Sequence, residues 1–170
     1  VTGVQTCALP ISGRTDSYTD FAFDANYYWI ANPRSVVADV VSAHATLIHE
    51  KQRLSASNIL TGATRDNELN TFRADVSYSI GATWTPSVQY FRTAGSPNAL
   101  YAALAGAAPN SSGFVGEIAY VPWGKPDSPW PWINIRLAAQ YFAYTEFNGT
   151  SHGASGNNNV FLSAWLAFHF

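Results

Sequence analysis

Histidines are the residues of this sequence best suited to chemistry, because imidazole acts as a general acid or base and as a metal ligand. His44 stands between Ser42 and Thr46, so hydroxyl groups and an imidazole lie close together, as a nucleophilic site requires. The only two closely spaced histidines are His44 and His49, which are five residues apart. An extended strand directs such a pair to opposite faces, so this spacing does not favour a shared metal ion.

The other histidines do not complete a catalytic or metal site. His152 lies in a segment rich in glycine and asparagine, which favours a solvated loop, and His169 is expected on the polar side of the last strand, near its end. The sequence contains no glycine-rich phosphate loop and no cluster with the spacing of metal ligands. We therefore expect a protein that is not an enzyme and that binds no metal and no cofactor.

The composition is unusual for a soluble domain. Of the 170 residues, 47% are hydrophobic and 15% aromatic, but only 12% are charged, against about 25% in soluble domains. No stretch reaches the roughly 18 apolar residues of a membrane-spanning helix. A net charge of −2 also argues against nucleic acid as a partner. Low charge with many aromatic residues is typical of β-structure in which hydrophobic and polar residues alternate.

The first eleven residues, VTGVQTCALPI (Val1–Ile11), resemble the in-frame translation of a sequencing-adapter oligonucleotide. We expect them to be a non-native leader and exclude them from the fold. A truncated signal peptide is disfavoured, because the segment lacks a basic region and a sustained apolar run. Cys7 belongs to this leader, so residues 12–170 contain no thiol. Residues 12–170 are then expected to be the C-terminal part of a longer protein.

A period of two recurs along residues 12–170 and predicts about seven strands. It is clearest at 72–80, where Phe72 and Val76 belong to an apolar set that alternates with Arg73 and Asp75. Arg92 shares parity with apolar neighbours, so its facing stays open. The expected strands cover residues 21–30, 37–53, 72–80, 87–93, 114–121, 133–144 and 160–170. Asn98 is expected to cap a short helix over residues 99–105.

Connector lengths and aromatic residues predict how these strands are arranged. The segments 31–36, 81–86 and 122–132 alternate along the chain with the longer segments 54–70, 94–113 and 148–159. Short turns on one side and long loops on the other are typical of an up-and-down antiparallel β-barrel in a membrane. Aromatic residues at predicted strand ends are expected to form an interfacial rim: Tyr27, Trp29, Trp84, Trp123, Trp130 and Trp132.

The final segment, VFLSAWLAFHF, resembles the terminal strand of proteobacterial outer-membrane β-barrels, which ends in Phe after alternating hydrophobic residues. The matching residues are Leu162, Ala164, Leu166, Phe168 and Phe170. In those families the barrel-assembly machinery reads this segment, so the resemblance implies that machinery and outer-membrane lipid as partners. More loosely, GEIAYVPWGKP and NIRLAAQYFAYTEFNG resemble porin-like barrels of Gram-negative bacteria, some of which are found with c-type cytochromes. The implied fold is an all-β transmembrane β-barrel fragment in the bacterial outer membrane.

Ionisable residues share the parity opposite to the apolar one. A membrane barrel turns that face to its lumen, because an Arg facing lipid costs roughly 2–4 kcal/mol at the midplane. The residues expected to line the lumen are Asp24, His44, Glu50, Arg73, Asp75, Glu117, Arg136, Gln140 and Glu146. Five carboxylates against two arginines predict a weak preference for cations.

These features favour a porin-like barrel for passive passage of small solutes. One alternative is a structural scaffold or sheath around a plug, a lipoprotein or a periplasmic or cytochrome partner. Another is an outer-membrane barrel enzyme of the phospholipase or protease type, which needs a Ser/His/acid cluster at the outer rim. A third is a soluble ligand-binding barrel, which would place apolar residues inside and charges outside.

The membrane interpretation predicts which residues face outward and whether the sheet closes. The residues expected to face outward share the apolar parity: Phe72, Val76, Tyr78, Leu137, Tyr141, Leu166 and Phe168. Single-chain bacterial barrels have an even number of strands, so about seven strands predict an open or poorly closed sheet. Val1–Ile11 are expected to stay unpaired.

Overall fold

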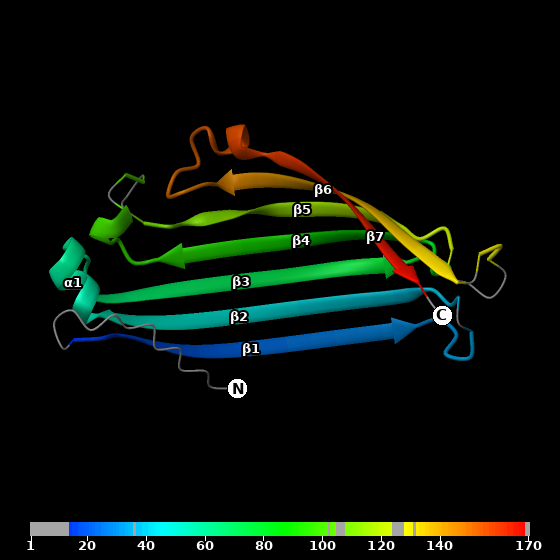
Figure 1. The fold of residues 1–170 in the computed structure, drawn as a ribbon, viewed down its shortest axis with the longest axis horizontal. Coiled ribbons are helices and arrows are strands. Elements are labelled where there is room, and N and C mark those ends of the chain that lie inside the picture. The colour runs from blue at the N-terminus through cyan, green and yellow to red at the C-terminus, as the bar shows by residue number, and fades with distance from the viewer. Residues whose placement is uncertain are drawn as a thin grey trace.

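One antiparallel sheet makes up most of the described chain. The structure is a computed structural model and describes residues 14–35, 37–101, 103–104, 108–123, 128–130 and 132–168. Its strands, in chain order, are β1 Asp16–Ile30, β2 Val40–Leu54, β3 Asp66–Ser79, β4 Trp84–Gly95, β5 Ser111–Tyr120, β6 Ile133–Glu146 and β7 Asn159–Phe168. Each strand pairs only with its sequence neighbours (Figure 1), so the predicted all-β, up-and-down arrangement is confirmed.

Several strands are longer than the alternation of residues predicts. β1 begins at Asp16 instead of residue 21, and β3 begins at Asp66 instead of residue 72. These extensions are polar, with Asp66 of β3 paired to Arg53 of β2. Backbone hydrogen bonds continue the ladder past the apolar band, and they need no hydrophobic side chains. The residue pattern therefore marks the apolar part of each strand and misses its polar end.

The sheet is open. Strands β1 and β7 are its two edges, and no described strand pairs with their outer sides. Every consecutive pair is antiparallel, so β1 and β7 run in the same direction, and a seam directly between them would be parallel. The prediction of an open sheet is confirmed. Val1–Ile11, which include Cys7, lie outside the described residues, as do His169 and Phe170.

Exposure along β5 shows that the middle of the sheet is covered on one face only. Val115 and Ala119 are 7% and 1% exposed, whereas Phe114 and Ile118 are 48% and 49% exposed. Successive strand residues point to opposite faces, so the curl of the sheet covers the face that carries Val115. We call this covered side the concave face and the side that carries Phe114 the convex face.

The register places the predicted outward set on the convex face, and all its members are exposed: Phe72, Val76, Tyr78, Leu137, Tyr141, Leu166 and Phe168. The prediction of their facing is confirmed. Phe72 pairs with Arg92, which settles the open parity of β4: Arg92 lies on the convex face, near the end of the strand.

Short helices lie in the loops at one end of the sheet (Figure 1): α1 Ser55–Thr61, η1 Ala99–Tyr101 and η3 Ala154–Asn157. None of the helices among the described residues has the length and hydropathy needed to cross a membrane. The predicted connector at 54–70 contains α1, whose first backbone N–H groups are satisfied from β1. The Asp16 carboxylate accepts hydrogen bonds from the Ala56 and Ser57 amides at 2.8 and 3.1 Å.

Asn98 caps a shorter helix than the sequence predicts. Its side-chain oxygen accepts a hydrogen bond from the Leu100 amide at 3.1 Å, at the start of the 3₁₀-helix η1. The same oxygen accepts one from the Thr64 amide at 3.1 Å, so Asn98 also joins this loop to the α1 loop. Residues 102 and 105 of the predicted helix lie outside the described part.

The opposite end of the sheet carries the predicted aromatic rim. β1 ends there, β4 begins there, and the β5–β6 connector lies there, so the meander brings all six rim residues to this end. Trp84 stacks on Tyr120 with ring centroids 4.2 Å apart, and Trp123 meets Trp130 edge-on at 4.6 Å. The first contact joins β4 to β5. The second brings together two residues of the connector between β5 and β6.

Asp39 joins two turns at this end. Its carboxylate accepts hydrogen bonds from the Tyr78 hydroxyl at 2.6 Å and from the Gly81 amide at 2.8 Å, while its backbone oxygen accepts from the Ala31 amide at 3.0 Å. The turn after β1 is thereby fixed to the turn after β3. The hydrogen bond from Tyr78, followed by that from Gly81, holds the pKa of Asp39 below its ordinary value of 3.8.

We predict that Asp39→Ala lowers the urea midpoint of unfolding at pH 7. The ionised carboxylate favours the folded state above the ordinary pKa of 3.8, and this contribution is lost as the pH falls through the lowered folded-state pKa. The difference between the variant and the parent protein should therefore shrink below pH 3.8. Tyr78→Phe, which removes one of the donors, should show the same dependence in part. A difference in urea midpoint between Asp39→Ala and the parent protein that stays constant down to the lowest pH would contradict a stabilising role of the ionised carboxylate.

Candidate functional site

A hydrogen-bonded polar cluster surrounds His44 on the concave face. The strand register sets Asn26 of β1 opposite His44 and His44 opposite Asp75 of β3. His44 Nε2 lies 2.9 Å from Asp24 Oδ2, and Nδ1 lies 3.2 Å from Asp75 Oδ1. Thr46 and Asn26 each donate a hydrogen bond of 2.8 Å to Asp24. Three residues predicted to share one face are thus in direct contact.

This cluster lacks the hydrogen bonds of a nucleophilic site. Both ring nitrogens of His44 are occupied by carboxylates. The hydroxyl of Thr46 lies 3.1 Å from Nε2, but it donates to Asp24, while Ser42 bonds to Ser77 at 2.6 Å. No hydroxyl of the cluster therefore donates to an imidazole nitrogen that is free to act as its base. With two carboxylates and one imidazole, the cluster is negative in either protonation state of the ring.

A second cluster on the concave face joins β5 to β6. Glu117 forms an ion pair with Arg136, and its other carboxylate oxygen accepts a hydrogen bond from the Gln140 amide. The Glu117 side chain is only 14% exposed, whereas that of Arg136 is 41% exposed. Alternation predicted that these residues share a face. It did not reveal that Arg136 neutralises Glu117, because that contact depends on the register between two strands.

Glu50 lies nearer the loop end of the same face. Its carboxylate accepts a hydrogen bond from Gln52, and β1 places Asp20 directly opposite. One oxygen of Asp20 is buried without a hydrogen-bond partner among the described residues. Sequence reasoning missed both Asp20 and Gln52. The period of two could have found them, since each shares parity with Glu50. Asp20 was missed because the first predicted strand begins only at residue 21, whereas Gln52 lies inside the predicted strand 37–53 and was missed because only ionisable residues and Gln140 are assigned to the lumen.

A β-bulge makes Glu146 an exception to simple alternation. The register between β5 and β6 shifts at Ser112/Gly113, so Gly113 faces Tyr144 while Ser112 faces Glu146. Parity along β6 therefore does not assign the Glu146 side chain to the concave face. A side chain at Gly113 would collide with the carbonyl oxygen of Ala143, so only glycine fits this close approach of the two strands.

The convex face is apolar across its middle. The charged residues that the register places there lie toward the loop end of the strands: Lys51, Arg53, Asp66, Glu68 and Arg92. Of the segment that resembles an assembly signal, Leu162, Ala164, Leu166 and Phe168 lie on this face of β7 and are exposed. Phe170 is not among the described residues.

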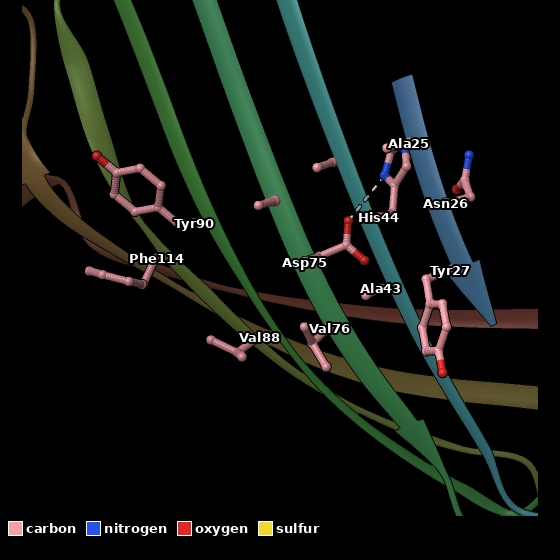
Figure 2. A pocket seen from close by; sticks show the side chains of 12 residues that line it. Ala25, Asn26, Tyr27, Ala43, His44, Asp75, Val76, Val88, Tyr90 and Phe114 are labelled. Atoms are coloured by element: carbon pink, nitrogen blue, oxygen red, sulfur yellow. Dashed lines mark hydrogen bonds and ion pairs between the residues drawn. The ribbon is translucent and has the colours of Figure 1, made fainter. Parts of the chain in front are cut away.

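Small side chains leave a shallow groove of about 470 Å³ between β1 and β5 (Figure 2). Its alanines come from adjacent strands, with Ala25 opposite Ala45 and Ala45 opposite Ala74. Tyr90 and Phe114 stand beside it, with ring centroids 5.2 Å apart. The groove contains very little polar surface, although Figure 2 shows the contact between His44 and Asp75 close by.

Comparisons with known proteins add no assignment. No family model matches the chain, and no curated protein and no solved structure matches it. Within the described residues, no group of three or more His, Cys, Asp and Glu side chains is placed to hold a metal ion. The function is therefore argued from the geometry of the two faces.

We predict that Arg136→Gln destabilises the folded chain by about 1–3 kcal/mol, because Glu117 is left as a largely buried carboxylate without its cation. The double variant Glu117→Gln/Arg136→Gln should recover part of this loss, since two neutral amides can bond to each other. Urea unfolding in lipid vesicles, followed by tryptophan fluorescence, measures both. A single variant as stable as the parent protein would show that the ion pair does not stabilise this part of the sheet, and a double variant no more stable than the single one would show that the loss does not come from the unpaired carboxylate of Glu117.

Proposed function

We propose that the chain forms part of a porin-like β-barrel in the bacterial outer membrane that allows passive passage of small solutes. The observation that carries this proposal is the sorting of side chains between the two faces. The convex face is apolar across its middle, while the concave face carries Asp24, His44 and Asp75 in one cluster and Glu117 with Arg136 in another. In the proposed arrangement, lipid contacts the convex face and water fills the concave side.

The cost of charge in lipid supports this orientation over a soluble barrel. A soluble barrel buries its apolar side chains inside, but here Phe114 and Ile118 lie outside, about half exposed. Lipid would cover those side chains, and the charged groups would keep their hydration in an aqueous lumen. The aromatic end of the sheet, with Trp84 stacked on Tyr120, suits an interface between lipid headgroups and water.

The edges of the sheet set a further requirement. In lipid, every backbone N–H and C=O group needs a partner, and β1 and β7 each leave one side unpaired among the described strands. The proposed barrel therefore includes strand partners at both edges. The assembly machinery and outer-membrane lipid enter the proposal through the resemblance of the terminal strand, whose alternate residues Leu162 and Leu166 are exposed at an edge.

The proposal predicts ion conductance with a weak preference for cations. The complete protein of which this chain is proposed to form part is purified and added to a planar lipid bilayer under a KCl gradient, and the reversal potential is measured. Carboxylates exceed arginines among the proposed lumen residues, but pairing of Glu117 with Arg136 and of His44 with two aspartates weakens their field.

Asp24→Asn removes one of these carboxylates and should move the reversal potential towards zero. Arg92→Gln, on the convex face, is the matched control and should leave it unchanged. Clear anion selectivity would contradict the charge argument. Absence of conductance would contradict passage and favour the structural scaffold.

A further inference from the structure

A second cavity, of about 320 Å³, lies on the concave face and is lined by both polar and aromatic side chains. Arg73 of β3, Gln89 of β4 and Gln140 of β6 provide its polar groups. Phe91, Phe142 and Tyr144 provide aromatic walls. This cavity is separate from the alanine groove of Figure 2, which opens on the convex face and has almost no polar surface.

Arg73 is the group in this cavity that remains free to bind an anion. Among the described residues, its guanidinium forms no ion pair and no hydrogen bond, although Asp75 lies two residues along the same strand and Asp24 and Glu117 lie on the same face of β1 and β5. Those carboxylates are occupied: Asp24 and Asp75 bond to His44, and Glu117 bonds to Arg136. The positive charge of Arg73 is therefore not neutralised by a neighbour.

The amides beside Arg73 add hydrogen-bonding capacity. Gln89 forms no side-chain hydrogen bond within the described part of the chain and is half-buried. Gln140 uses its amide N–H group on Glu117, which leaves its carbonyl oxygen able to accept. A ligand that brings both acceptor and donor atoms can thus be held beside the guanidinium.

The aromatic walls are held in place by packing. Phe91 meets Tyr144 edge-on with ring centroids 5.5 Å apart, and Tyr144 meets Phe147 edge-on at 4.9 Å. The ring of Phe91 on β4 lies over Gly113 of β5, its partner in the register, because Gly113 has no side chain. A Cβ at Gly113 would lie 3.0 Å from the Phe91 ring. The bulge described above therefore also shapes one wall of the cavity.

We propose that this cavity binds a small organic carboxylate that carries an apolar ring, of the size of benzoate. A planar guanidinium matches both oxygens of a carboxylate, and the aromatic walls suit the edge and face of a ring. The volume lies near the lower end of the range of about 300–1,000 Å³ for ligand pockets, which favours a small ligand. The inference rests on the proposed function and names a class of solute for the same concave face.

The predicted cation preference and this binding site depend on different properties of the concave face. The summed charge of the lumen affects small inorganic ions at a distance and is screened by salt. A binding cavity acts only on a molecule that contacts it. An organic carboxylate can therefore bind at Arg73 even where the face as a whole carries more carboxylates than arginines.

Binding of benzoate to the purified full-length chain in detergent micelles, measured by saturation-transfer NMR, tests the inference. We expect saturable binding, and binding at least about tenfold weaker for benzamide, which has the same shape without the charge. Arg73→Gln should weaken benzoate binding by at least about tenfold, and Arg73→Lys by less, because lysine keeps the charge and loses the planar fork. Arg92→Gln removes the same charge from the convex face and should change nothing.

Three results would overturn the inference: benzamide binding as tightly as benzoate, unchanged binding by Arg73→Gln, or inorganic phosphate competing as strongly as benzoate, which would indicate a simple anion site. Phe142→Leu should weaken benzoate binding without weakening that of phosphate. The conductance measurement is independent of these results. Conductance without benzoate binding would refute the cavity alone, and benzoate binding that depends on Arg73, without conductance, would refute solute passage alone.

Discussion

Strand register keeps the two faces of this sheet different. Successive residues point to opposite sides, so a slip of one residue in any pairing would move polar side chains to the convex face and apolar ones to the concave face. The pairings from β1 to β5 hold one frame: Ala43, Val76 and Val88 lie in one row, and His44 and Asp75 lie in the adjacent row on the other side. The register shifts at Ser112/Gly113, near the loop end of β5.

Given that frame, the polar side chains of the concave face largely satisfy one another. His44 links carboxylates from two neighbouring strands, and Glu117 receives both Arg136 and Gln140. Such contacts fix side chains without filling the concave side with apolar groups, which suits the water-filled lumen of the proposed barrel. Arg73 is an exception that carries a positive charge, because its guanidinium is bonded to no carboxylate among the described residues. A face that holds many of its polar groups in hydrogen bonds and leaves one guanidinium available is suited to selecting among solutes that touch it.

The sequence predicted the faces better than the contacts. The period of two belongs to each strand alone, so the facing of Phe72 and Val76 followed from local pattern. The partner of Glu117 could not be predicted, because it depends on how far β6 is shifted along β5. The polar start of β3 escaped detection because backbone pairing there has no apolar signal. The α1 helix depends on Asp16, a residue about 40 positions away that accepts hydrogen bonds from its first turn.

The central claim is that lipid contacts the convex face and water the concave face. It is tested most directly by single cysteines at Val76 and Ser77, adjacent residues of β3 on opposite faces, in a chain whose only cysteine has been removed by Cys7→Ser. Lipid vesicles that contain each variant are treated with a charged, membrane-impermeant thiol reagent. The account predicts rapid labelling of Ser77→Cys in intact vesicles. It predicts labelling of Val76→Cys only after a denaturing detergent has removed the lipid and unfolded the chain. Equal labelling of both, or faster labelling of Val76→Cys in intact vesicles, would contradict it.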